Sequence, residues 1–155
     1  MNDSSAFPQA ETIEQLRQNL ATVRARIDQA CVQAGRDPQE VRLLPVSKTH
    51  PADYLRLAYA AGCRMLGENK VQEAYQKWQE LEDLQDLQWC VIGHLQTNKA
   101  KYVARFASEF HALDSLRLAQ ALDQRLIIED RYLYVLVQIN TSGAESKYGI
   151  DAEQA

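Results

Sequence analysis

The sequence predicts an α/β fold built around a parallel sheet, and two observations lead to this prediction. Short apolar runs typical of buried strands recur every ~20–25 residues, with a helical segment between each pair. Polar or charged residues follow each run where it stops, as expected where strands give way to loops. The chain of 155 residues is long enough for one domain with a sizeable core.

The first predicted strand lies in Val41–Pro51, which reads V-R-L-L-P-V-S-K-T-H-P. Its leucines and Val46 suit a strand buried on both faces, although Pro45 removes a donor from the ladder. Lys48 lies where the predicted strand ends and a loop begins, and Pro51 suits the first position of the helix that follows. An amine half withdrawn from water there is a better nucleophile toward an aldehyde. The alternative is a plain surface lysine at a strand end.

A long helix is predicted before the first strand, as an addition to the repeat. Residues 1–11 are expected to form a flexible leader. The stretch Thr12–Gln15 (T-I-E-Q) is a capping box that opens the helix, and Gly35 supplies its C-terminal stop. Apolar residues three and four positions apart predict one buried stripe along it: Ile13, Leu16, Leu20, Val23, Ile27 and Cys31.

Helices and strands alternate after the first strand. Further strands are expected at Cys63–Leu66, Trp89–Ile92, Phe110–Leu113 and Tyr132–Ile139. Helices are expected at Pro51–Ala61 and around Val71–Leu81, Ala100–Ala107 and Leu116–Leu126. Candidate N-caps for the last three are Asn69, Thr97 or Asn98, and Ser115. Asn140 begins a polar loop with no clear element after it, and the two tryptophans are expected in the core.

Each predicted strand ends in side chains able to do chemistry: Lys48, Glu68 with Asn69, His94, Asp114 with Ser115, and Asn140 with Ser142. In a parallel sheet these ends lie on the same side. Singly, Asn69 is more often a cap and His94 a structural histidine, but together the set favours a ligand site. Lys99 and Lys101 near a helix start either extend into solvent or attract an anionic ligand.

Composition excludes several functions. The net charge of −4 gives no reason to expect nucleic-acid binding, and no apolar run approaches the ~20 residues of a membrane helix. The N-terminus lacks the features of a secretory signal. Three widely spaced cysteines predict reduced packing thiols in a cytoplasmic protein. The sequence contains no metal-ligand spacing, no nucleotide-binding glycine motif and no nucleophile elbow.

Four motifs occur in this order: P-V-S-K-T-H-P, L-G-E-N-K-V-Q-E, W-C-V-I-G-H-L-Q-T-N-K and V-Q-I-N-T-S-G-A-E-S-K-Y-G. Together they resemble the pyridoxal phosphate homeostasis protein family, whose bacterial members are the YggS-like proteins. The resemblance runs from about Val41 to Ile150, and the leading helix fits it too. It implies a TIM-type (β/α)8 barrel like the N-terminal domain of alanine racemase, with an extra N-terminal helix.

The resemblance also implies a site and a role. Lys48 would hold pyridoxal 5′-phosphate as a Schiff base, with Asn69 and His94 around the cofactor. Lys147 matches a second lysine, placed to receive or relay the cofactor. The implied role is non-catalytic cofactor homeostasis, with delivery to recipient apo-enzymes, in a protein that is monomeric at full length. Two alternatives are a racemase-like or lyase-like enzyme using the same lysine, and a half-barrel that binds nothing.

The chain departs from this family in length. A complete barrel has eight strands and ~250 residues, whereas about five βα units are predicted here. The barrel domain expected at residues 12–155 would then be incomplete, with its first and fifth strands as open edges. The loops after strands seven and eight, which commonly hold phosphate in such barrels, are not among the predicted units. A fragment or a truncated gene product is favoured over a dimer that closes the sheet.

Overall fold

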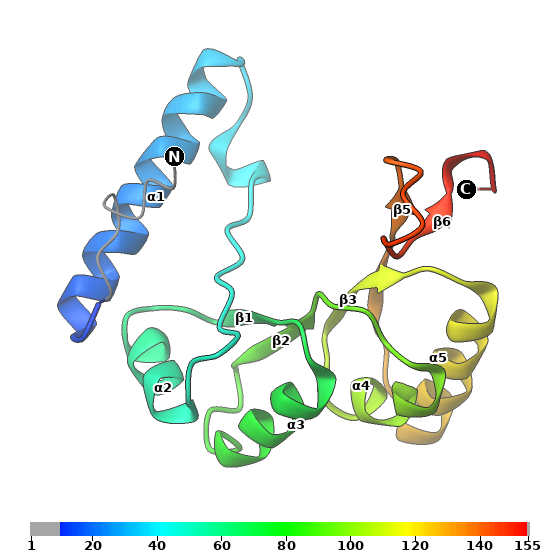
Figure 1. Ribbon diagram of the computed structural model, residues 1–155. Helices are drawn as coiled ribbons and strands as arrows, with labels where there is room; N and C mark the ends of the chain where they lie inside the picture. The colour runs from blue at the N-terminus through cyan, green and yellow to red at the C-terminus, as the bar shows by residue number, and fades with distance from the viewer. Residues whose placement is uncertain (1–9, 155) are drawn as a thin grey trace.

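The computed structural model describes residues 10–154 and contains a parallel sheet of four strands in the order β1-β2-β3-β4 (Figure 1). These strands are β1 (Met65–Glu68), β2 (Gln88–Val91), β3 (Glu109–Leu113) and β4 (Tyr134–Val137). The helices are α1 (Ile13–Gln33), α2 (Ala52–Ala60), α3 (Val71–Glu80), α4 (Ala100–Phe106) and α5 (Leu116–Glu129). Short 3-10 turns are η1 (Pro38–Glu40), η2 (Thr97–Lys99) and η3 (Ala152–Gln154). A separate parallel pair joins β5 (Ile139–Asn140) to β6 (Ile150–Asp151). The predicted α/β class is therefore confirmed.

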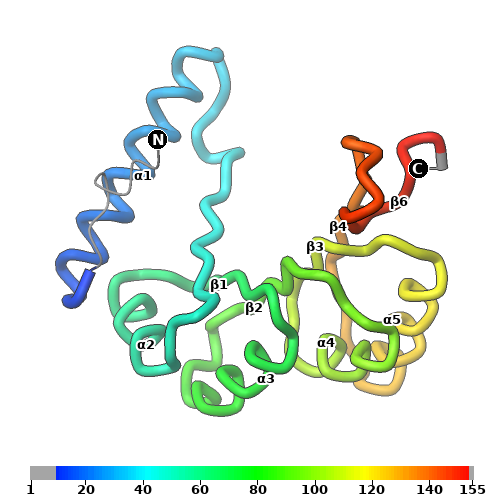
Figure 2. Tube along the Cα trace, in the orientation of Figure 1, coloured from blue at the N-terminus to red at the C-terminus, as the bar shows by residue number. Residues whose placement is uncertain are grey.

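Helices α2 to α5 lie along one side of the sheet, whereas α1 and the β5–β6 pair lie beyond its other side (Figure 2). Alternate strand residues face the helices, and Leu66, Trp89 and Phe110 are almost fully buried there. Trp78 packs against the same core, so both tryptophans are core residues as predicted. Covering one face only is the arrangement of a singly wound βα repeat, in which the second face turns toward a barrel interior.

The predicted first strand is reduced to a single bridge between Val46 and Gly67. Gly67 N donates to Pro45 O at 2.8 Å, and Ser47 N donates to Gly67 O at 2.9 Å. Pro45 has no N–H of its own, which limits the ladder at this point. The expectation of burial on both faces is wrong, because the side chain of Val46 is 46% exposed.

Helix α1 follows its predicted pattern. Thr12 and Gln15 form both hydrogen bonds of the capping box, and Gly35 follows the helix with a left-handed φ of 64°. All six residues of the predicted stripe are at least partly shielded, and Cys31 is buried. Residues 1–9 of the expected leader lie outside the described part. Ala10, in contrast to the prediction, is buried and accepts a hydrogen bond from Tyr54 Oη at 2.8 Å.

Only one of the three later caps is confirmed. Ser115 Oγ accepts a hydrogen bond from Leu118 N and caps α5. The prediction that Asn69 caps α3 is wrong, because the N-cap is Lys70 and no side chain bonds the helix there. Neither Thr97 nor Asn98 caps α4, because a 3-10 turn precedes that helix and supplies its first backbone bonds.

The predicted fifth strand, Tyr132–Ile139, is divided into β4 and the short β5. Every residue of β4 is exposed, and among residues 10–154 the strand pairs with β3 alone. The segment 41–46 borders the opposite side of the sheet through the Val46 bridge, so the predicted first and fifth strands lie at its two sides within the described part of the chain. The polar loop after Asn140 leads into β6 and η3, which the sequence did not predict. None of the helices within residues 10–154 is long and apolar enough to cross a membrane.

Candidate functional site

The sequence-predicted residues follow strands at the carboxyl edge of the sheet. Lys48 lies in the loop before α2, Asn69 follows β1 and His94 follows β2. Lys147 lies in the loop between β5 and β6. Lys48 and Lys147 are exposed, so the expectation of a half-shielded Lys48 amine is wrong for the chain as described. Among residues 10–154, the Lys48 side chain has no hydrogen-bond or ion-pair partner.

A buried charge network lies directly beside Lys48, between β1 and α3. Lys77 Nζ is 2.8 Å from Glu68 Oε1 and 2.9 Å from Glu73 Oε1, and it donates to Ser47 O at 3.2 Å. Ser47 Oγ donates to Glu68 Oε1 at 2.6 Å. Glu68 is 0% exposed and Lys77 6% exposed, which is rare for charged residues unless they are paired. Ser47, Glu68, Glu73 and Lys77 are called the Lys77 network below.

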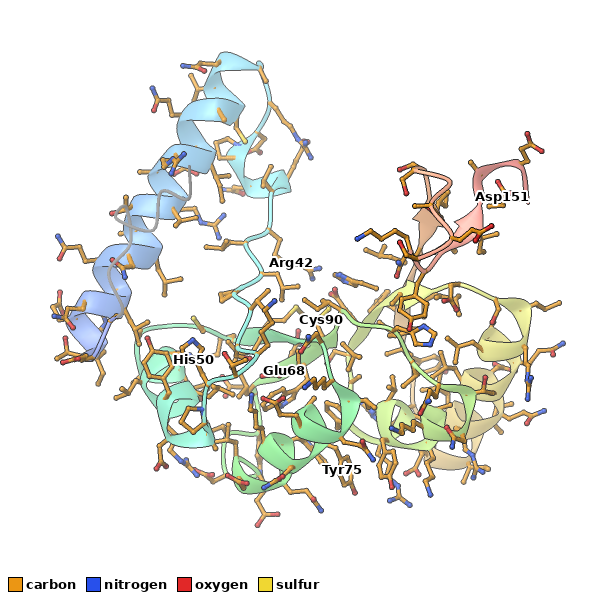
Figure 3. All side chains as sticks on the ribbon, in the orientation of Figure 1. Arg42, His50, Glu68, Tyr75, Cys90 and Asp151 are labelled. Carbon is orange, nitrogen blue, oxygen red and sulfur yellow. The ribbon has the colours of Figure 1, made fainter. Side chains whose placement is uncertain are left out.

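The Lys77 network has two electrostatic consequences. The hydrogen bond from Lys77 lowers the pKa of Glu73, with partial burial acting in the opposite direction. Glu73 therefore stays ionised and also accepts a hydrogen bond from Thr49 N at 3.3 Å. Glu68 Oε2 is buried and has no hydrogen-bond partner among the described residues, so Lys77 and Ser47 bind only one oxygen of that carboxylate. Figure 3 shows Glu68 between the sheet and α3.

Asn69 and His94 share a hollow of about 590 Å³ with Glu73 and Lys99. Gly93 makes this arrangement possible, because a Cβ at that position would lie 1.9 Å from Asn69 O. Lys99 Nζ donates to Gln72 Oε1 at 3.1 Å at the rim. Lys48 does not line this hollow. Glu73 also lines the adjoining depression beside Thr49, so it joins the two parts of the edge.

His94 is held between two partners. Its Nδ1 lies 3.4 Å from Asp114 Oδ2, and its ring stacks on Tyr148 with 3.8 Å between centroids and 9° between planes. Tyr148 follows Lys147 in the chain, so this stack brings the second predicted lysine's loop over the strand ends. Asn140 Nδ2 donates to Ala144 O at 3.0 Å and closes the same loop. The structure thus gathers Asn69, His94 and the Lys147 loop, with Lys48 one loop away.

A second polar cluster lies on the open face of the sheet, away from these residues. Ligand atoms of Cys90, Glu109 and His111 lie within 4.8 Å of one another, a grouping that the sequence spacing did not reveal. Arg42 bonds both oxygens of Glu109, with Nη2 at 2.7 Å from Oε2, and His111 Nε2 is 2.9 Å from the same oxygen. Burial, with Glu109 nearby, raises the pKa of Cys90 to about 12. Arg42 and His111 thus occupy the carboxylate of Glu109, and the Cys90 thiol stays protonated at neutral pH; Figure 3 shows Arg42 and Cys90 there.

Sequence reasoning missed the partners of the site residues. Glu68 was placed at a strand end, but its pairing with Lys77 was not foreseen. The available signal was spacing: Lys77 is four residues after Glu73 and three after Ala74, on the inward face of α3. Asp114 was placed at its strand end without its link to His94. The stack of Tyr148 on His94 connects residues far apart in sequence and left no local signal.

Comparison with known proteins gives consistent matches over most of the chain. The family model for the alanine racemase N-terminal domain matches residues 12–155. A protein of Pseudomonas aeruginosa named pyridoxal phosphate homeostasis protein is 45% identical over 138 residues, which is 89% of this chain and 60% of that protein. The Aquifex aeolicus protein of the same name is 40% identical over 136 residues, or 88% of this chain and 59% of that protein. The chain therefore spans about 60% of the length of these curated relatives.

Solved structures agree. PipY of Synechococcus elongatus, solved without pyridoxal phosphate, is 37% identical and has a TM-score of 0.78, covering 90% of this chain and 60% of that one. The structure of PipY with pyridoxal phosphate bound is 38% identical with a TM-score of 0.73, covering 88% and 58%.

Proposed function

The chain belongs to the family of the alanine racemase N-terminal domain, with relatives named pyridoxal phosphate homeostasis proteins, and we propose that it binds pyridoxal 5′-phosphate through Lys48. The single observation that supports this most is the state of Lys48. It lies two residues after the Val46 bridge, is exposed, and its side chain has no partner among the described residues. A lysine free of ion pairs at a strand end is available to an aldehyde.

The described residues suit this cofactor in kind. The Lys48 nitrogen would add to the aldehyde carbon with loss of one water, forming a carbon–nitrogen double bond. Asn69 and His94 would contact the cofactor from the hollow they share. Lys99 at its rim supplies positive charge for an anionic group. The cofactor supplies the reactive carbonyl, whereas the protein supplies placement and charge.

The proposed role is to hold and release the cofactor rather than to turn over a substrate. The names of the relatives support homeostasis as the function. Lys147, in the loop tied to His94 by Tyr148, is proposed as the second amine, which receives the cofactor before it passes to recipient apo-enzymes in the cytoplasm. The singly wound sheet fits a (β/α)8 barrel interior on its open face, and a monomer is proposed for the complete protein.

Borohydride trapping tests the proposal. The chain is incubated with pyridoxal phosphate, reduced and digested, and the labelled lysine is identified by peptide mass mapping. We expect the label on Lys48 and its loss in Lys48→Ala, whereas Lys101→Ala, a matched change of an exposed lysine on α4, keeps it. A label spread over surface lysines, or none, contradicts the proposal. Racemisation or transamination of amino acids by the same sample would replace homeostasis with catalysis.

A further inference from the structure

We infer that the Lys77 network positions Lys48 for reaction with an aldehyde. The network fixes the backbone on both sides of Lys48 and keeps nearby carboxylates away from its amine. This inference rests on the proposed function, because the position of Lys48 affects labelling only if that amine reacts. The residues concerned lie on β1, on α3 and in the loop itself, so three separate segments meet at this lysine.

Hydrogen bonds to β1, to α3 and within its own loop hold Ser47, the residue before Lys48. Ser47 N donates to Gly67 O at 2.9 Å, and Ser47 O accepts from Lys77 Nζ at 3.2 Å and from His50 N at 3.2 Å. The Ser47 hydroxyl donates to Glu68 Oε1 at 2.6 Å. Ser47 is 6% exposed, so these bonds lie out of competition with water. The backbone conformation just before Lys48 is therefore fixed.

The residue after Lys48 is held in an unusual conformation. Thr49 has a φ of 69°, in the left-handed region that β-branched residues rarely adopt. Its N–H donates to Glu73 Oε1, the same oxygen that pairs with Lys77. A strained conformation persists only where surrounding contacts determine it, and two contacts do so here: the turn bond from His50 N to Ser47 O and the bond from Thr49 N to Glu73. Glu73 and the turn bond together hold the backbone just after Lys48.

The network also affects which carboxylates are available to pair with the Lys48 amine. Glu68 and Glu73 each contact a residue adjacent to Lys48, and either carboxylate could stabilise its ammonium form. Lys77 binds both instead, at 2.8 Å and 2.9 Å. An ammonium held in an ion pair is a poor nucleophile, because only the neutral amine adds to a carbonyl. Lys77 thus holds the anchoring carboxylates and leaves Lys48 unpaired.

Variants of Glu73 separate positioning from general stability. Glu73→Ala removes the acceptor for Thr49 N, and Glu73→Gln keeps an oxygen at that position. Glu80→Ala is the matched control, because Glu80 is an exposed glutamate on the same helix, outside the network. Each protein is assayed for the rate of borohydride-trapped labelling at Lys48 and for its thermal midpoint. Amide hydrogen exchange of the peptide around Thr49 is measured without any aldehyde.

We expect Glu73→Ala to label Lys48 about tenfold more slowly and to exchange the Thr49 amide faster, since small misplacements of a reacting group cost large factors in rate. Glu73→Gln should recover most of both, and Glu80→Ala should match the wild type. Equal labelling rates and equal exchange in Glu73→Ala and the wild type would overturn the inference. If the wild type itself is not labelled at Lys48, the proposed function fails. The exchange measurement still tests the inference in that case, because an unchanged Thr49 amide exchange rate in Glu73→Ala would show that the network does not control the loop.

Lys77→Met provides a second measurement. Losing one partner of a buried ion pair is strongly destabilising, so this variant is expected to lower the thermal midpoint. Where it remains folded, Lys48 labelling should slow at temperatures well below that midpoint. A folded Lys77→Met protein that labels at the wild-type rate would contradict the positioning role.

Discussion

The imidazole of His94 lies flat against the ring of Tyr148, with 3.8 Å between ring centroids and 9° between ring planes. This stack holds the loop after β5 against the strand ends, although Tyr148 is 58% exposed. We expect Tyr148→Ala to release the loop and to accelerate tryptic cleavage after Lys147. Tyr148→Phe keeps the ring and should behave as the wild type. Tyr132→Ala, a change at a tyrosine that is 94% exposed, serves as the control; equal cleavage rates in all four proteins would contradict the role of the stack.

Two glycines, Gly67 within β1 and Gly93 after β2, should respond differently to alanine. A Cβ at Gly93 would lie 1.9 Å from Asn69 O, whereas one at Gly67 would lie 3.5 Å from the side chains of Leu44 and Val46. We therefore expect Gly93→Ala to lower the free energy of unfolding by about 2 kcal/mol or more, and Gly67→Ala to change it by less than about 1 kcal/mol. Urea denaturation of both variants tests this, and a Gly93→Ala protein as stable as Gly67→Ala would show that Asn69 can move away.

The pair of Arg42 and Glu109 should make stability depend on pH. The hydrogen bonds from Arg42 lower the pKa of Glu109, burial opposes this, and His111 adds to the lowering. Because the folded-state pKa is depressed, the stabilisation is complete above the unfolded-state pKa and is lost as pH falls through the folded value. Because the Arg42 side chain is 57% exposed, solvent screens the pair, and Arg42→Met should therefore cost about 1 kcal/mol at neutral pH and progressively less in acid. Denaturant titrations across pH, with exposed Arg26→Met as control, measure it; a cost independent of pH would be inconsistent with the ion pair.

Cys90 should be chemically silent in the folded chain. Burial, with Glu109 nearby, raises its pKa to about 12, so the reactive thiolate is scarce at neutral pH. We expect iodoacetamide at pH 8 to leave Cys90 unmodified while the native fold persists and to alkylate it once guanidinium unfolds the chain. Peptide mass mapping distinguishes Cys90 from Cys31 and Cys63, which are also free and buried. Rapid alkylation of Cys90 in the native protein would mean that the polar cluster of Cys90, Glu109 and His111 opens to solvent.

The outer edge of β4 should cause self-association. All four of its residues are exposed, and an unpaired apolar strand edge invites pairing with another chain. Leu136→Lys places a charge on this edge and should reduce association in sedimentation velocity experiments. Ile127→Lys, at a residue of α5 that is 73% exposed, is the control and should have a smaller effect. If both substitutions act equally, general surface hydrophobicity rather than the strand edge is responsible.

The sequence predicted what depends on local pattern. The capping box of Thr12 and Gln15 and the Ser115 cap follow from spacing within a few residues, the βα repeat follows from the alternation of such local patterns, and all are present. The cysteines were correctly predicted to be unpaired packing residues. The predicted first strand is reduced to one bridge because Pro45, in the middle of the apolar run, has no N–H to donate to the ladder. This effect of proline was visible in the sequence.

The other features of the candidate site depend on contacts between residues that are far apart in the sequence. Lys77 contacts Glu68 across nine positions and Ser47 across thirty, so no local window includes the network. The exposure of β4 and Lys48 depends on which surfaces have neighbours, which hydrophobicity alone cannot specify. The stack of Tyr148 on His94 likewise joins two distant loops, because His94 precedes α4 in the sequence and Tyr148 follows α5.

The spatial order of the sheet repeats the order of synthesis, since β1, β2, β3 and β4 are neighbours in turn. Each strand therefore needs only the unit made just before it, and the contacts it forms close short loops at small entropic cost. Such a sheet can be assembled step by step as the nascent polypeptide leaves the ribosome. The contacts that anchor the Lys48 loop reach only to β1 and α3, so every residue that shapes this loop precedes β2 in the chain.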